Sequence, residues 1–314
     1  MNILVSTDAH YQHITETMLF SLAENNPSHT LHVWCMHSRL TEKEKRTFQL
    51  YLQNRCGVHD INFVDMSWMK NIEDSLPLYI KHISIETYYR LFAHFVLPKN
   101  LNRILWLDSD IIVRGKLDEL YNQDLEDVSL VAFPNMGDSA VGGNAERLGL
   151  PRNYTYFNAG VLLLNLDFLR HSSPKEQLMT FFAQYGASFK QQDQDALNLL
   201  YYKTARVIDD HRYNFMVNAL PLCSSSDLAE KALLVHYAGW QKPWRIKWQN
   251  EYSCYWWNVK RKEGLSYKDY LILYIGYLWK VLRLNTLEKW VLSPYYWLQA
   301  RIKTDDKRHY PHME

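Results

Sequence analysis

The chain has 314 residues, of which 47% are hydrophobic and 22% charged, so it can form a large folded core and lacks the composition of a disordered protein. Its net charge is only +1, which gives no electrostatic reason to expect a nucleic-acid partner. The four cysteines lie far apart without the spacing of a metal or redox motif, and the N-terminus opens with a strand pattern instead of a signal peptide. We therefore expect a cytoplasmic protein with reduced thiols.

The first 107 residues alternate short apolar strands with helices. The predicted strands cover 3–5, 31–36, 61–64 and 103–107, and the predicted helices cover about 13–25, 41–55 and 84–97. The second helix begins with a capping-box sequence at 41–44. This order is typical of an α/β fold with a mostly parallel sheet flanked by helices, in which ligands bind at the carboxyl ends of the strands.

Two aspartates follow the fourth predicted strand. Asp108 and Asp110 are two residues apart, so both side chains point to the same side of the chain and offer oxygen ligands to a divalent cation. A later strand predicted at 232–235 ends in His236, an imidazole ligand, and Lys242 follows in a loop where its charge can reach phosphate. No glycine-rich phosphate loop of the Walker or dinucleotide-binding kind is present, so a metal and side chains would have to hold any phosphate.

Each of these residues also has a simpler interpretation. Taken alone, an Asp-x-Asp at a strand end is more often a turn or a helix cap than a metal site. His236 alone would more often be a buried core histidine, and Lys242 a solvated loop charge. Their combination in one chain, with Ser6-Thr7-Asp8 after the first predicted strand, favours a metal–diphosphate site where these strand ends meet.

Six segments, in matching order, resemble the motifs of glycosyltransferase family 8, the retaining hexosyltransferases that include the glycogenins and the general stress protein A-like enzymes. The resemblance covers residues 1 to about 245. The segments are Ser6-Thr7-Asp8 with Tyr11, then 82–91, 105–110, 156–161, 192–198 and 236–244. Within the family they resemble the bacterial lipooligosaccharide-type α-galactosyltransferases.

This resemblance implies a GT-A fold and a retaining hexosyltransferase. The implied donor is UDP-galactose, with UDP-glucose as the alternative, and the implied acceptor is a glycan, glycoprotein or glycolipid of the bacterial surface. The resemblance also implies Mn²⁺, with Mg²⁺ as the alternative, bound by Asp108, Asp110 and His236. The residues implied to bind the donor and its metal are Ser6, Thr7, Asp8, Tyr11, His82, Arg90, Asp108, Ser109, Asp110, Asn158, Gly160, Asp193, Gln194, Gly239 and Lys242.

The resemblance places Arg90, Asp193, Gln194 and Lys242 at the reacting centre. Retention by double displacement needs a carboxylate nucleophile, and Asp193 is the candidate. A front-face route needs no protein nucleophile, because the leaving diphosphate helps to deprotonate the acceptor hydroxyl while Gln194 hydrogen-bonds the sugar. We favour the front-face route, with the metal and Lys242 stabilising the charge that builds on UDP.

Three of the matching segments also have purely structural interpretations. Arg90 could face solvent on its helix, 158–160 could form a tight turn, and 193–195 could supply the first-turn carboxylates of a helix. The chain also departs from the nearest bacterial relatives at two places, since His10 replaces an asparagine and the segment Phe133-Pro134-Asn135 lies where they have a carboxylate. We expect donor binding to survive these changes, whereas acceptor identity cannot be carried over.

Residues 246–314 lie outside the resemblance, so we expect a catalytic domain at 1–245 and a mainly helical extension at 246–314. The extension is basic, with 12 Lys and Arg against 7 Asp and Glu, and it holds six of the 11 Trp and nine of the 22 Tyr. Its apolar run at 270–279 is too short to cross a bilayer. The composition fits peripheral contact with the inner face of the cell membrane, contact with acceptor sugars, or packing against the catalytic domain.

Two other functions stay open from the residues alone. The run at 107–113 resembles the nucleophile strand of haloacid-dehalogenase-type phosphatases, and Asp209-Asp210 resembles their acidic metal motif. That nucleophile normally follows the first strand, however, and a phosphatase leaves the segment 236–244 unexplained. The second alternative is a non-catalytic relative that only binds sugar nucleotides, but the expected metal ligands and Lys242 are all present.

Overall fold

The computed structural model describes residues 1–76, 85–138, 143–172, 175–219, 226–239, 241–245 and 251–282. The chain divides into two compact units. The first comprises residues 1–243 and 250–264, and the second comprises residues 244–249 and 265–314. Every predicted site residue that the structure describes lies in the first unit.

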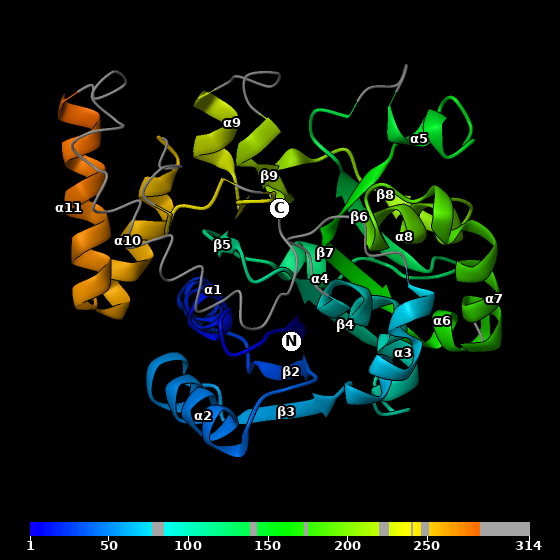
Figure 1. The fold of residues 1–314 in the computed structure, drawn as a ribbon, viewed down its shortest axis with the longest axis horizontal. Helices are drawn as coiled ribbons and strands as arrows, with labels where there is room; N and C mark the ends of the chain where they lie inside the picture. Colours follow the sequence, from blue (N-terminus) through cyan, green and yellow to red (C-terminus); the bar gives the residue numbers. More distant parts are fainter. Residues whose placement is uncertain are drawn as a thin grey trace. The chain divides into compact units, whose positions relative to one another are not determined.

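Seven strands form the main sheet in the order β3-β2-β1-β4-β7-β6-β8 (Figure 1). They are β1 (Asn2–Ser6), β2 (His32–His37), β3 (Asp60–Asp65), β4 (Arg103–Leu107), β6 (Leu130–Pro134), β7 (Phe157–Asn165) and β8 (Ala205–Val207). β1 pairs in parallel with β2 and β4, β2 with β3, and β6 with β8, whereas β7 runs antiparallel to both of its neighbours. The predicted mostly parallel α/β sheet is confirmed, and the first four predicted strands correspond to β1–β4.

The described helices of the first unit are α1 (Gln12–Asn25), α2 (Glu42–Cys56), α3 (Ala93–Val96), α4 (Asp118–Tyr121), α5 (Asn144–Arg147), α6 (Leu166–Ser172), α7 (Lys175–Tyr185), α8 (Asp193–Tyr201), α9 (Ser226–Lys231) and α10 (Ser253–Glu263). Short 3₁₀ helices join them at η1 (Ser67–Ser75), η2 (Ile85–Phe92), η3 (Gly186–Ser188), η4 (His211–Tyr213) and η5 (Val217–Ala219). The predicted capping box of α2 is confirmed, because Thr41 and Glu44 each bond the other's main-chain N–H through a side chain.

Helices cover both faces of the main sheet because the side chains of each strand alternate between the faces. Ile3 and Val5 of β1 join the apolar core that α1 and α2 cover. Leu4, which lies between them, joins a second core with Trp106 and side chains of α6, α7 and α8. Figure 1 shows these two groups of helices, blue and green, on different sides of the strands.

The helix predicted at 84–97 is wrong in type. The structure has the 3₁₀ helix η2 followed by the single-turn α3. Residues 88–92 are all buried, so this segment packs on every side and lacks the single apolar face of a surface α-helix. Tertiary packing therefore decides its conformation, and it places Arg90 in the interior.

A second, three-stranded sheet has the order β5-β10-β9 and consists of β5 (Ile111–Val113), β9 (Phe215–Met216) and β10 (Leu234–His236). β10 runs antiparallel to β5, with His236 opposite Ile111, and parallel to β9, with His236 opposite Met216. The strand predicted at 232–235 lies two residues later at its start and includes His236 as its last residue. This register brings His236 next to the residue that follows Asp110.

Helix α10 belongs to the first unit, although it follows the domain boundary expected at residue 245. Its last residue, Glu263, accepts hydrogen bonds from Thr17 of α1 and Tyr51 of α2. Trp256 and Trp257 of the same helix are buried. α10 is therefore part of the packed body that carries the predicted site.

In the second unit, the structure describes α11 (Tyr267–Leu282). Tyr267, Tyr270 and Tyr274 on this helix are exposed. No helix within the described ranges combines the length and the apolar character that crossing a bilayer requires. The roles predicted for residues 246–314 stay predictions.

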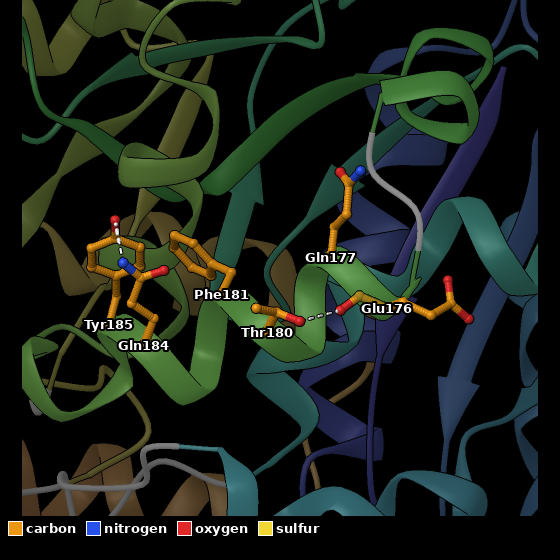
Figure 2. Close-up of a pocket in the computed structure, with 6 residues that line it drawn as sticks. All are labelled: Glu176, Gln177, Thr180, Phe181, Gln184 and Tyr185. Atoms are coloured by element: carbon orange, nitrogen blue, oxygen red, sulfur yellow. Dashed lines mark hydrogen bonds between the residues drawn. The ribbon is translucent and has the colours of Figure 1, made fainter.

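A shallow hollow lies along α7 (Figure 2). It is lined by Glu176, Gln177, Thr180, Phe181, Gln184 and Tyr185, all from this one helix. None of these is a predicted site residue, and no cluster of ionisable groups faces the hollow. The polar cluster at the end of β4 is therefore the candidate site.

Candidate active site

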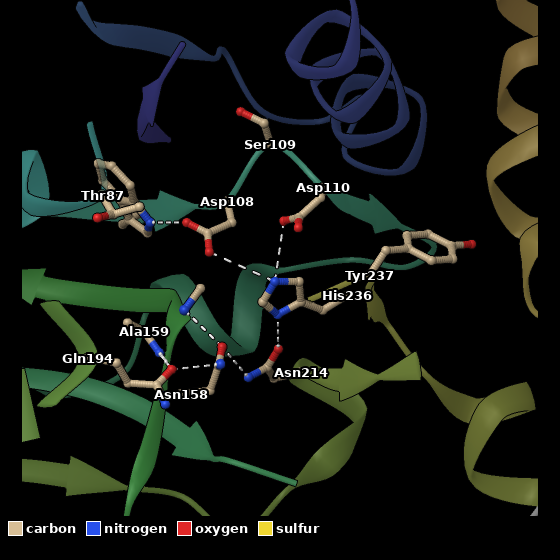
Figure 3. Close-up of polar contacts among 12 residues, drawn as sticks. Thr87, Asp108, Ser109, Asp110, Asn158, Ala159, Gln194, Asn214, His236 and Tyr237 are labelled. Carbon is tan, nitrogen blue, oxygen red and sulfur yellow. Dashed lines mark hydrogen bonds and ion pairs between the residues drawn. The ribbon is translucent and has the colours of Figure 1, made fainter. Parts of the chain in front are cut away.

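The two predicted aspartates and the predicted histidine converge. Asp108, Asp110 and His236 each offer one ligand atom within 4.8 Å of the others. His236 Nε2 lies 3.3 Å from Asp110 Oδ1 and 3.8 Å from Asp108 Oδ2 (Figure 3). The histidine is 2% exposed, and the carboxylates are partly exposed, so a ligand can reach the cluster from the carboxylate side. The predicted meeting of these strand ends is confirmed.

The main chain explains why these side chains face one another. Asp108 N donates to Gly160 O of β7 at 2.9 Å, and Tyr237 N donates to Asp110 O at 3.0 Å. Ser109, between the aspartates, points the other way and donates its hydroxyl to Ser6 O at 3.1 Å. A turn at Ser109 and Asp110, between β4 and β5, thus brings both carboxylates into the site, and the serine anchors this turn to β1.

Each carboxylate has its own cationic partner. Arg90 Nη2 lies 3.0 Å from Asp108 Oδ1, and the same oxygen accepts from Trp106 Nε1 at 2.8 Å. Lys242 Nζ donates to Asp110 Oδ2 and, at 2.7 Å, to the main-chain oxygen of Tyr237. Burial alone would raise the pKa of Asp110, but the charges of Lys242 and His236 hold it below its usual range.

The cluster fits a divalent cation. Two carboxylates and an imidazole form a mixed oxygen and nitrogen donor set that first-row divalent metals accept. Gly160 gives the imidazole its space, because a Cβ at this position would lie 2.3 Å from His236 Cε1. The interpretation of 158–160 as a turn is wrong, since these residues lie within β7.

Arg90 also connects the carboxylate cluster to Asp193. Its Nε lies 3.2 Å from Asp193 Oδ2, and its guanidinium stacks on Trp106 with 4.4 Å to the ring centroid. The solvent-facing alternative for Arg90 is therefore wrong. Burial raises the pKa of Asp193 to about 6, although Arg90 opposes the rise, and the charge of Asp108 adds to it.

The side chain of Gln194 is held by a set of amides. Its Oε1 accepts from Asn158 Nδ2 at 2.9 Å and from Ala159 N at 3.1 Å (Figure 3). Its Nε2 donates to Asn135 Oδ1 at 3.4 Å. Gln192, just before this segment, has a left-handed backbone with φ 50°. Such a conformation is costly for a residue with a Cβ and is typical of constrained functional segments.

Asp195 fixes this segment from inside. It is fully buried, pairs with Arg147 Nη2 at 2.7 Å, and accepts from Tyr156 OH at 2.6 Å. It also accepts from the main-chain N–H groups of Lys190 and Gln191. The prediction that 193–195 opens a helix holds, since α8 begins at Asp193, but the two aspartates differ: Asp195 holds the preceding loop, and Asp193 faces Arg90.

The N-terminal residues of the prediction lie on the other side of Ser109. Thr15 Oγ1 lies 3.0 Å from Thr7 Oγ1 and 2.8 Å from Ser109 Oγ. Asp8 accepts from Tyr11 N at 2.7 Å and so closes the turn into α1. Of the remaining predicted donor residues, Gly239 has φ 73° in the loop before Lys242, and His82 lies outside the described residues.

Trp106 and Asn214 contact the expected metal ligands and were not predicted as site residues from the sequence. Trp106 donates to Asp108, and Asn214 contacts His236. Trp106 reads as an ordinary apolar residue of β4, and Asn214 lies between Tyr213 and Phe215 outside every matching segment. Only the pairing of β9 with β10 brings Asn214 to the site, and no sequence pattern signals that pairing.

Known proteins resemble this chain in sequence. The family model described as glycosyl transferase family 8 matches residues 2–247. A putative glycosyltransferase of Haemophilus influenzae is 26% identical over 271 residues, covering 84% of this chain and 78% of that protein. A lipopolysaccharide 1,2-glucosyltransferase of Escherichia coli is 26% identical over 279 residues, covering 81% of this chain and 75% of that protein. GlyE of Streptococcus pneumoniae is longer, and this chain spans 63% of it.

The fold is also shared with a solved structure. A crystal structure of the galactosyltransferase LgtC with donor and acceptor sugar analogs has a TM-score of 0.73 and 24% identity, covering 85% of this chain and 98% of that one. The predicted GT-A fold is therefore confirmed. The phosphatase alternative is wrong, because the matched family consists of glycosyltransferases and Asp210 of the supposed second motif pairs with Arg212. The match over residues 2–247 shows that the chain belongs to glycosyltransferase family 8.

Proposed function

We propose that this enzyme transfers galactose from UDP-galactose, with retention, to a hydroxyl of a bacterial surface glycan, and that it uses Mn²⁺. The observation that carries the proposal is the cluster of Asp108, Asp110 and His236 with Lys242 beside it. The fold shared with the galactosyltransferase LgtC supports galactose as the sugar. The similarity to a lipopolysaccharide glucosyltransferase makes UDP-glucose the alternative donor.

The cation, held by Asp108, Asp110 and His236, would supply positive charge against the diphosphate of the donor. Lys242 and Arg90 add fixed charges on either side of the carboxylates. Both are buried, so their interactions with an anion are weakly screened. These residues would therefore stabilise UDP more as it departs, when its negative charge grows, than while it is bound to the sugar.

The surroundings of Asp193 and Gln194 support a front-face route. Asp193 is buried and forms an ion pair with Arg90, and burial raises its pKa to about 6. Its carboxylate is therefore occupied by the guanidinium and is not a free nucleophile. Gln194 is held by Asn158 and Ala159 and can present its amide to the sugar. In this route the bond from C1 to the phosphate oxygen breaks, the bond from C1 to the acceptor oxygen forms on the same face, and the acceptor proton passes to the leaving diphosphate.

The test is a screen of UDP-hexoses for hydrolysis and for transfer to lipooligosaccharide fragments, with Mn²⁺, with Mg²⁺ and with chelator. We expect UDP-galactose to be the best donor and the activity to need Mn²⁺. A preference for UDP-glucose would correct the sugar and leave the site standing. His236→Ala should weaken Mn²⁺ more than Mg²⁺, because imidazole suits the softer ion. Activity that persists in chelator, or equal losses for the two metals, would contradict the metal site.

A further inference from the structure

The imidazole of His236 is held by a hydrogen-bonded chain that begins at fixed main-chain donors. Gly160 N lies 2.9 Å from a side-chain atom of Asn158. A main-chain N–H can only donate, so that atom of Asn158 must be its oxygen. The amide of Gln194 is oriented by the same reasoning. Its atom near Ala159 N must be the oxygen Oε1, and this oxygen also accepts from the nitrogen of Asn158. Figure 3 shows the side chains of Asn158 and Asn214 lying between Gln194 and His236.

Asn214 is the next member of the chain. One of its side-chain atoms lies 3.1 Å from Asn158 Oδ1, which already acts as an acceptor, so this atom must be the amide nitrogen. The oxygen of Asn214 then faces His236 Nδ1 at 2.9 Å. An amide oxygen only accepts, so His236 Nδ1 must carry a hydrogen. In the neutral ring, Nε2 is therefore left with its lone pair directed at Asp108 and Asp110.

We propose that Asn214 is a positioning residue that holds His236 in the Nδ1–H tautomer and so keeps Nε2 free to bind a cation. Asn214 is fully buried and bonded at both ends, so its amide cannot turn without breaking two hydrogen bonds. Through Asn158 the same amide also links the imidazole to Gln194. The metal ligand and the residue proposed to face the sugar are thus positioned by one amide network.

The proposal rests on the metal site proposed above, and it predicts different results for two variants. Asn214→Leu removes the partner of His236 Nδ1 and should weaken Mn²⁺ binding by about 10- to 100-fold, the usual cost of losing a partner behind a metal ligand. Asn214→Asp keeps an oxygen acceptor for Nδ1 but loses the donor to Asn158. Its Mn²⁺ affinity should stay close to wild type, while its transfer rate falls because a carboxylate oxygen then faces Asn158 Oδ1 and displaces the amide that contacts Gln194.

Asn26 offers a matched control. It is buried and hydrogen-bonded like Asn214, to Leu22 O, Gly115 O and Leu117 N, and it makes no contact with the site residues. Asn26→Leu should lower thermal stability by a comparable amount and leave Mn²⁺ affinity unchanged. A difference between the two leucine variants therefore separates positioning of the ligand from general loss of packing.

The experiment measures binding of Mn²⁺ alone to the full chain by calorimetry, and the tautomer of His236 by ¹⁵N NMR of the metal-free protein at alkaline pH. His236→Gln identifies the ring signals. We expect Nδ1–H in the wild type and in Asn214→Asp, even if Asn214→Leu fails to fold. An Nε2–H wild type, or wild-type Mn²⁺ affinity in a folded Asn214→Leu, would overturn the role of Asn214. A wild type that binds no Mn²⁺ but shows Nδ1–H would contradict the metal site and support the tautomer assignment.

Discussion

Arg90 Nε lies 3.2 Å from Asp193 Oδ2 in the interior of the protein, so the charge of this guanidinium opposes the rise in pKa that burial causes in the carboxyl group. The raised pKa means that the folded protein binds this proton more tightly than the unfolded chain does. Asp193 therefore contributes stability at low pH that is lost as the pH rises through about 6. Above that pH the side chain is a carboxylate paired with Arg90, and we expect the active enzyme to contain this form.

The first prediction follows from this pair. The kcat/KM for Mn²⁺-dependent hydrolysis of UDP-galactose should fall as the pH drops through about 6, because protonated Asp193 no longer pairs with Arg90. Asp193→Asn should be slower and should lose this acid limb, since an amide does not titrate. The measurement is the pH–rate profile of both proteins. An unchanged acid limb in the asparagine variant would assign it to another group.

The second prediction concerns Lys242. Lys242→Ala should raise the activation free energy by about 3 kcal/mol and so lower turnover on the order of 100-fold. The reason is that the buried cation beside Asp110 would no longer stabilise departing UDP. Steady-state kinetics with UDP-galactose would check this. Lys45→Ala is the control, since Lys45 forms a surface ion pair with Glu42 and should have no effect on turnover. Similar rates for both alanine variants would argue against a role for Lys242.

The third prediction compares Gly160 and Gly115, two glycines at which an added Cβ would come equally close to a neighbouring side chain. A Cβ at Gly160 would lie 2.3 Å from the ring of His236, whereas a Cβ at Gly115 would lie 2.4 Å from the flexible end of Leu233. Both alanine variants should lose stability, but only Gly160→Ala should lose Mn²⁺ affinity, because only there must a proposed ligand move. Thermal melts and Mn²⁺ calorimetry on the same samples would separate the two effects. Wild-type affinity in Gly160→Ala would contradict the ligand geometry.

Much of the site could be predicted from the sequence because its ligands follow strands with clear apolar patterns. Asp108 and Asp110 come directly after β4, and His236 ends β10. The partners that orient these ligands could not be predicted in the same way. Arg90 is buried through the packing of a 3₁₀ segment whose pattern resembles an α-helix, and Asn214 reaches His236 only through the register of a two-residue strand. Local patterns report strand ends, whereas these contacts depend on tertiary packing.

Helix α10 shows the same limit at the level of domains. Its tryptophans suggest a surface that could bind acceptor or membrane as readily as one that packs. In the structure, Trp256 N donates to Tyr237 OH at 3.2 Å, and that hydroxyl donates to Tyr252 O at 2.7 Å. Tyr237 follows His236 directly, and its main-chain oxygen holds Lys242. Tyr252 and helix α10 therefore support the metal site through Tyr237. The sequence resemblance stops at about residue 245 and so did not indicate this role.

The last prediction separates the parts of that segment by two truncations. A chain that ends after Arg245 loses α10, with its buried Trp256 and Trp257, its bonds from Glu263 to α1 and α2, and the partners of Tyr237. Burying one large aromatic side chain contributes roughly 1.5–3 kcal/mol, and a whole domain is stable by only about 5–15 kcal/mol, so this chain should unfold or aggregate.

A chain that ends after Gly264 keeps the first unit and should retain its thermal stability and Mn²⁺-dependent hydrolysis of UDP-galactose. Transfer to the natural acceptor should fall if residues 265–314 contact the acceptor or the membrane. Co-sedimentation of the full chain with anionic vesicles distinguishes these two roles, since membrane binding through basic residues weakens with salt. Full transfer by the chain ending after Gly264 would contradict both roles, and a stable, active chain ending after Arg245 would contradict the support that α10 gives to the site.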